Sequence, residues 1–72
     1  GGDAMSESPM ALIRKLDEAA KALRHLAEQV KSAAPEVTDE ELRHEMLESA
    51  AGLEKRAGDL AEATARLRMK IN

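Results

Sequence analysis

The spacing of apolar residues divides the chain into two amphipathic helices. Across residues 12–34 the apolar positions recur in steps of three and four, and the same pattern resumes across residues 42–71. This spacing lines up apolar side chains along one side of a helix, whereas a half-buried strand would need strict alternation. The sequence therefore predicts an all-α protein with one helix at about 9–33 and a second at about 39–70.

A turn is predicted at residues 34–38. Pro35 has no backbone N–H and disfavours a helical conformation at Ala34, so the first helix should end just before it. Thr38 and Glu41 form a Thr-x-x-Glu capping box, which predicts Thr38 as the N-cap of the second helix. Because so short a turn reverses the chain, the two helices should form an antiparallel hairpin.

The first helix has start signals of its own. Ser8 suits the N-cap, and Pro9 suits the first helical position, where a missing N–H does no harm. The glycine-rich start of the chain resembles a cloning remnant placed before Met5. We therefore expect residues 1–7 to be a tag remnant and a disordered N-terminus, and residues 8–72 to form the hairpin.

Composition narrows the function classes. The 72 residues include no cysteine and no aromatic residue, and the net charge is -3. This composition excludes disulfides and thiolate metal sites, and it supplies no ring on which a base could stack. The net negative charge argues against nucleic acid as the main partner. No apolar run reaches the roughly 18 residues of a membrane span, and no signal peptide is visible, so we expect a cytoplasmic protein without a membrane partner.

One motif could bind metal. Glu41 and His44 have the Glu-x-x-His spacing that di-iron helical bundles use at inward-facing positions. Both residues fall on the polar side of the predicted helix, and the first helix has no matching pair. The chain also lacks a Gly-rich phosphate loop and a scaffold for a catalytic triad. We expect no enzyme and no cofactor, with a metal-binding bundle as the weaker alternative.

Basic residues gather at the open end of the hairpin. Arg66, Arg68 and Lys70 lie in the last turns of the second helix. They suit the negative end of the helix dipole, but alternate helical residues diverge by about 200° and do not share one face. A small regulatory or nucleic-acid-associated protein that uses this basic end is the alternative to an interaction module.

The width of the apolar stripes predicts self-association. Each helix of a hairpin has one neighbour, and a core this small supplies about 3–5 kcal/mol at most. Two hairpins that form a four-helix bundle would bury the apolar columns that a single hairpin leaves open. The leucines predicted to fill the seam of the hairpin are Leu16, Leu23, Leu53 and Leu60. The residues predicted at the contact between hairpins are Ile13, Ala20, Ala27, Leu47 and Ala61.

The end of the second helix should extend past the well-patterned part of the first. Leu67, Met69 and Ile71 lie there, and they are predicted to be covered by the N-terminus or a second hairpin, or to form a docking strip for another helical protein. The sequence as a whole predicts a protein–protein interaction module, a homodimer used for assembly, docking or as an adaptor.

Overall fold

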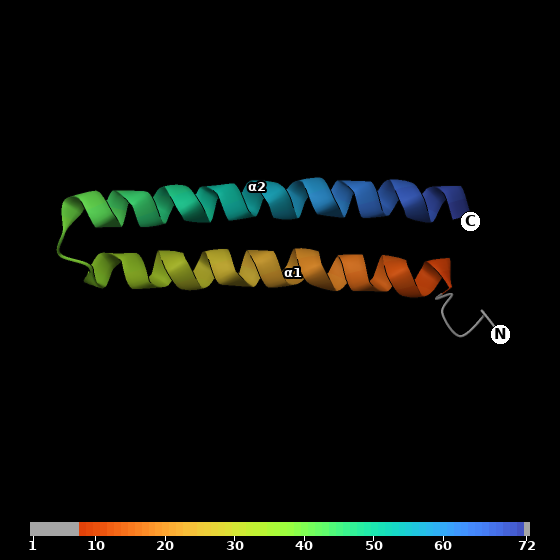
Figure 1. Ribbon diagram of the computed structural model, residues 1–72, viewed down its shortest axis with the longest axis horizontal. Helices are drawn as coiled ribbons and strands as arrows, with labels where there is room; N and C mark the ends of the chain where they lie inside the picture. The colour runs from red at the N-terminus through yellow and green to blue at the C-terminus, as the bar shows by residue number, and fades with distance from the viewer. Residues whose placement is uncertain (1–7, 72) are drawn as a thin grey trace.

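The computed structural model describes residues 8–71, and Figure 1 shows two long helices lying side by side in an antiparallel hairpin. Helix α1 spans Pro9–Ala33, the short 3-10 turn η2 spans Ala34–Glu36, and helix α2 spans Glu40–Ile71. No strand occurs in this part of the chain, so the predicted all-α hairpin is confirmed. The segment 1–7, predicted to be a tag remnant, lies outside the described residues.

Helix α1 begins at the predicted cap. Ser8 has an extended backbone, with φ -65° and ψ 151°, and Pro9 follows at the first helical position. The Ser8 hydroxyl oxygen accepts a hydrogen bond of 3.1 Å from the backbone N–H of Ala11. This bond satisfies one of the N–H groups that every helix start leaves without an intrahelical partner.

Helix α2 begins one residue later than the capping box predicts. The Asp39 carboxylate accepts hydrogen bonds from the backbone N–H groups of Glu41, at 2.9 Å, and Leu42, at 3.2 Å. The predicted cap at Thr38 is therefore wrong. A carboxylate can serve two N–H groups at once, and its negative charge is favoured at the positive end of the helix.

Arg43 ties the start of α2 to the turn. Its guanidinium Nη1 donates a hydrogen bond of 2.8 Å to the backbone carbonyl of Val37. Val37 is half-buried and extended, with φ -86° and ψ 120°, so it leads the chain out of η2. The bond gives a hydrogen-bond partner to a carbonyl of the turn, which lies outside both helices.

The contact between α1 and α2 is lined by small residues. Every buried side chain in the described range falls in one of two columns with a seven-residue repeat, and each of them is at most 2% exposed. We call these residues the alanine seam: Ile13, Ala20, Ala27 and Ala34 on one side, and Ala50, Ala57 and Thr64 on the other. Small side chains let two helix backbones approach closely. The buried Thr64 hydroxyl donates a hydrogen bond of 2.7 Å to the Leu60 carbonyl, so it has a partner.

This seam corrects the predicted arrangement of the apolar columns. Ile13, Ala20 and Ala27 were assigned to the contact between hairpins, and that assignment is wrong because all three are buried within one hairpin. The periodicity gives several adjacent apolar columns and does not say which one faces the neighbouring helix. The residues predicted to fill the seam lie beside it and are only half-buried: Leu16, Leu23, Leu53 and Leu60.

The hairpin is a single layer of helices. Its principal extents are 55 × 25 × 14 Å, and the radius of gyration is 16.7 Å, whereas a compact chain of this length has about 11 Å. The accessible surface of 5476 Å² likewise exceeds the about 4,400 Å² of a compact monomer of this mass. Domains ordinarily bury apolar faces between two layers. One layer leaves such a face open.

The cap at Asp39 gives the first prediction. Asp39→Ala should lower the free energy of unfolding by about 1 kcal/mol, because two N–H groups lose their acceptor. Thr38→Ala is the matched control and should change it by less than about 0.5 kcal/mol. Urea denaturation followed by circular dichroism measures both. The reverse order of effects would show that the helix is capped at Thr38.

The alanine seam gives the second prediction. Ala27 is 0% exposed, so Ala27→Leu should force the helices apart and destabilise the hairpin by about 1–3 kcal/mol. Ala51→Leu, at an exposed position of α2, is the control and should change stability by at most about 0.5 kcal/mol. Thermal unfolding at a fixed protein concentration compares them. Equal melting temperatures would contradict a close alanine contact.

Candidate interaction surface

Ion pairs mark one side of the contact between the helices. Lys31 Nζ lies 2.6 Å from a Glu54 carboxylate oxygen, and Arg68 Nη2 lies 3.7 Å from a carboxylate oxygen of Asp17. Each pair joins α1 to α2. All four residues follow a position of the alanine seam by four, which places them about 40° around their helices from it. We call the side that they line the ion-pair edge.

The Lys31–Glu54 pair is the tighter of the two. The hydrogen bond from Lys31 to the Glu54 carboxylate, together with its negative charge, raises the pKa of Lys31 above its ordinary value. Both side chains remain partly exposed, so solvent screens the attraction and its contribution to stability is small. The pair therefore helps to set the register of the helices more than it holds them together.

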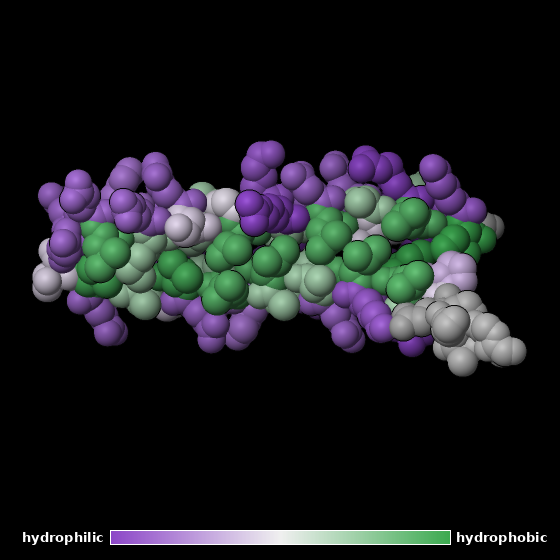
Figure 2. Space-filling view, viewed as in Figure 1, coloured by the Kyte–Doolittle hydropathy of each residue, from purple (hydrophilic) through white to green (hydrophobic). Residues whose placement is uncertain are grey.

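The opposite side of the hairpin is apolar. Residues three after and one before each seam position lie about 60° and 100° around the helix in the other direction. Leucine is the commonest residue in these columns, although the outer column of α2 also contains Ser49, Arg56 and Ala63. We call this surface the leucine face: Leu12, Leu16, Leu23, Leu26 and Val30 of α1, with Leu42, Met46, Leu53, Leu60 and Leu67 of α2. Figure 2 shows hydrophobic side chains in a continuous band along the length of the hairpin, bordered by hydrophilic ones.

Much of the leucine face is open to solvent. Leu12, Leu26, Leu42 and Leu67 are 48%, 46%, 49% and 42% exposed. The remaining residues of the face lie nearer the seam and are half-buried. A contiguous apolar face of this extent is uncommon on a monomer and is typical of a surface that meets another molecule.

Two predicted interface residues lie on the other side. Leu47 and Ala61 each stand seven residues from Glu54, so they share its column on the ion-pair edge. Leu47 is 42% exposed and Ala61 is half-buried. Neither of them belongs to the leucine face.

The predicted docking strip at the end of α2 is not one surface. Leu67, Met69 and Ile71 are 42%, 78% and 43% exposed, so all three reach solvent. Residues two apart on a helix diverge by about 200°, and Met69 therefore lies on the outer side of α2. Leu67 extends the leucine face, and Ile71 continues the column of the alanine seam beyond Thr64.

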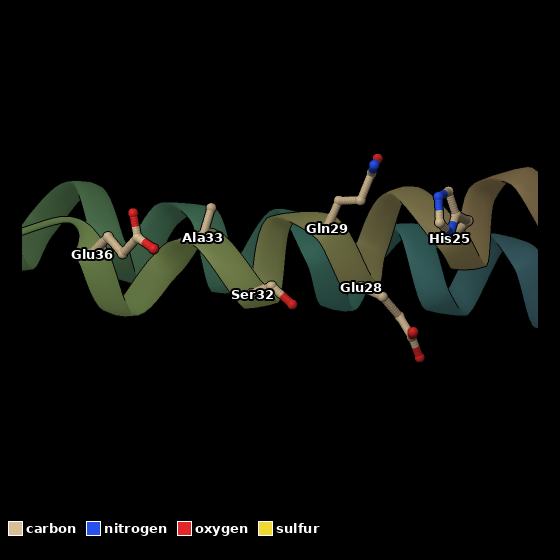
Figure 3. A pocket seen from close by; sticks show the side chains of 6 residues that line it. All are labelled: His25, Glu28, Gln29, Ser32, Ala33 and Glu36. Carbon is tan, nitrogen blue, oxygen red and sulfur yellow. The ribbon is translucent and has the colours of Figure 1, made fainter.

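The surface depressions do not bring reactive side chains together at one point. The one shown in Figure 3 lies along the end of α1 and η2, and its lining side chains point in different directions: Glu28 and Gln29 extend to opposite sides of the helix. Glu41 and His44 line another depression together with Glu40. The Nε2 atom of His44 lies 3.2 Å from a carboxylate oxygen of Glu48, one turn further along α2. Within residues 8–71, no cluster of three or more His, Asp or Glu side chains is placed to hold a metal ion.

The basic end of α2 is partly used within the hairpin. Arg68 is half-buried and paired with Asp17, whereas Arg66 and Lys70 are exposed on other sides of the helix. These three cations do not form a patch on one face. Neither α1 nor α2, as described, is long and apolar enough to cross a lipid bilayer.

Comparison with family models, with curated proteins and with solved structures finds no match for this chain. The leucine face is the main apolar surface that the hairpin leaves open within the described residues. Its α1 part was visible in the sequence as the column of Leu12, Ala19, Leu26 and Ala33, which recurs every seven residues. What the spacing left undecided is which of two adjacent columns turns toward α2.

The raised pKa of Lys31 gives a prediction about pH. A cation with a raised pKa in the folded state stabilises the fold below its ordinary pKa and loses this effect as pH rises through the raised one. The difference in stability between the wild type and Lys31→Met should therefore be constant at neutral pH and shrink in strong alkali. Lys21→Met, on the outer side of α1, is the control. Denaturation measured at a series of pH values, from neutral to strongly alkaline, gives the difference in stability. A difference that grows in alkali would contradict a raised pKa for Lys31 in the folded state.

Proposed function

We propose that this protein is a self-associating interaction module, in which two hairpins bury their leucine faces against each other to form a four-helix bundle. The observation that carries the proposal is the gathering of four of the five exposed leucines on one face, with Leu47 alone on the other side. Four large apolar side chains lie nearly half exposed on one face, while the other face is crossed by two ion pairs. A bundle of this kind would serve as an assembly or docking element between proteins.

A second copy is the occupant that fits this face best. The face runs along a hairpin 55 Å long and 25 Å wide, so a partner of the same length and breadth can cover it completely. Standard protein interfaces bury about 800 Å² on each partner, which a face of this size can supply. A second hairpin also adds the layer that one hairpin lacks.

The free energy gained on dimerisation decides at which protein concentrations the dimer should be looked for. Fully burying a leucine contributes about 1.5–3 kcal/mol, so burying the exposed half contributes about 0.7–1.5 kcal/mol. Four such leucines on each copy amount to about 6–12 kcal/mol, against an association cost of about 4–15 kcal/mol. The balance is close, so dimerisation should depend on concentration and is best followed from nanomolar to millimolar protein.

Two leucines of nearly equal exposure test the choice of face. Leu26, on the leucine face, is 46% exposed, and Leu47, on the ion-pair edge, is 42% exposed. Leu26→Glu should weaken the dimer by roughly a hundredfold or more, because it buries an unpaired charge on both copies. Leu47→Glu should leave the dissociation constant within about threefold of the wild type.

The concentration dependence of the melting temperature measures both variants. The dimer should melt at higher temperature as protein concentration rises, and this dependence should vanish for Leu26→Glu while it persists for Leu47→Glu. Equal effects of the two substitutions would mean that the leucine face is not the contact. A wild type that melts at one temperature over the whole range would rule out self-association.

A further inference from the structure

We infer that the two hairpins associate head to tail, with the turn of one copy beside the open end of the other and α1 packed antiparallel on α1 of the partner. This inference rests on the proposed self-association and adds the order of the helices to it. It draws on two independent features of the leucine face: the alternation of side-chain size along α1, and the charges at the two ends.

Side-chain size alternates along the outermost column of the leucine face on α1. That column reads Leu12, Ala19, Leu26 and Ala33, all exposed in the single hairpin. Laid antiparallel on its own copy about the middle of the helix, it sets Leu12 opposite the partner's Ala33 and Leu26 opposite the partner's Ala19. Each large side chain then meets a small one, which is the pairing that fills space without overlap.

The borders of the leucine face carry opposite charges at its two ends. Glu36 and Glu45 border it at the turn, whereas Lys15, Arg66 and Lys70 border it at the open end. A head-to-tail dimer places acidic borders beside basic ones. Glu45 and Arg66 stand equally far from the middle of α2, Glu40–Ile71, so each meets the other across the dimer. Head-to-head association would instead bring the acidic ends together.

The middle of α2 contains one like-charged contact in this arrangement. Arg56 belongs to the same column as Leu42 and comes near the Arg56 of the other copy. Asp59 follows Arg56 by one turn on the same border, so each copy supplies a carboxylate next to the opposing guanidinium. The Glu45–Arg66 pair occurs twice in the symmetric dimer, once at each end, and so outnumbers this single contact.

A single cysteine tests the order of the helices. The wild type contains no cysteine, and the exposed Ala22 lies at the middle of the segment from Pro9 to Glu36. Ala22 shares the border column of Lys15 and Glu36, so in the head-to-tail dimer its two copies come level with each other on the same side of the contact. Ala22→Cys should therefore form a disulfide-linked dimer under mild oxidation. Ala51→Cys, near the middle of α2 on the side away from the leucine face, is the matched control and should remain largely uncrosslinked.

Charge reversal tests the order in a second way. Glu45→Arg should raise the dissociation constant of a head-to-tail dimer by about two- to thirtyfold, because it sets like charges together at both ends. Arg66→Glu should do the same, and the double variant should restore wild-type affinity. In a head-to-head dimer Glu45→Arg would remove repulsion between the acidic ends and lower the dissociation constant.

These outcomes separate the order of the helices from self-association itself. A dimeric wild type in which Ala22→Cys does not crosslink, or in which Glu45→Arg tightens binding, overturns the head-to-tail order and leaves the proposed function standing. A wild type that sediments as a monomer at every concentration overturns both.

Discussion

The close contact of α1 and α2 along the alanine seam is the constraint on which the rest of the structure depends. Because mostly small residues fill it, the helices approach closely and no leucine is fully buried between them. The hydrophobic free energy that usually stabilises a helical domain is therefore only partly used within one chain. The large side chains remain beside the seam, on one face. The same contact that makes the hairpin also leaves an apolar face open to solvent.

The ion pairs between the helices lie on the side opposite to the leucine face. The pairs Lys31–Glu54 and Asp17–Arg68 cross from helix to helix on one side, and the Arg43–Val37 hydrogen bond fixes the turn. Exposed ion pairs contribute about 0–1 kcal/mol each, so they select a register and contribute little stability. Within α2, Gly52 and Gly58 border open space, where a β-carbon would meet nothing within 4 Å, and each costs about 1 kcal/mol relative to alanine. Helix α2 thus relies on its tertiary contacts.

Periodicity and caps were enough to predict the elements. The unbroken three-and-four spacing predicted two helices, and Ser8 with Pro9 marked the start of the first. The cap of α2 was mistaken because Thr38 and Asp39 are both good caps in adjacent positions, and only the geometry shows the Asp39 carboxylate accepting two N–H groups. The sequence alone does not decide which of two adjacent cap residues is used, because this depends on the path of the chain from η2 into α2.

The surface was harder to predict than the helices. Each helix has an alanine-rich column next to a leucine-rich one, and turning the helix by about 60° exchanges the two. The expectation that leucines fill the seam placed Ile13, Ala20 and Ala27 outside it, whereas all three are buried in it. The ion pairs that settle the rotation join residues far apart in the sequence, which only the fold brings together, and the periodicity of each helix carries no such information.

The measurement that tests this account most directly is the mass of the wild-type protein in solution, by sedimentation equilibrium over a wide range of concentration. The account predicts a reversible transition from one chain of 7.8 kDa to a dimer of twice that mass, since a single layer of two helices leaves its leucine face bare. A folded protein that keeps the mass of one chain at millimolar concentration would contradict it, because the exposed leucines would then need no partner.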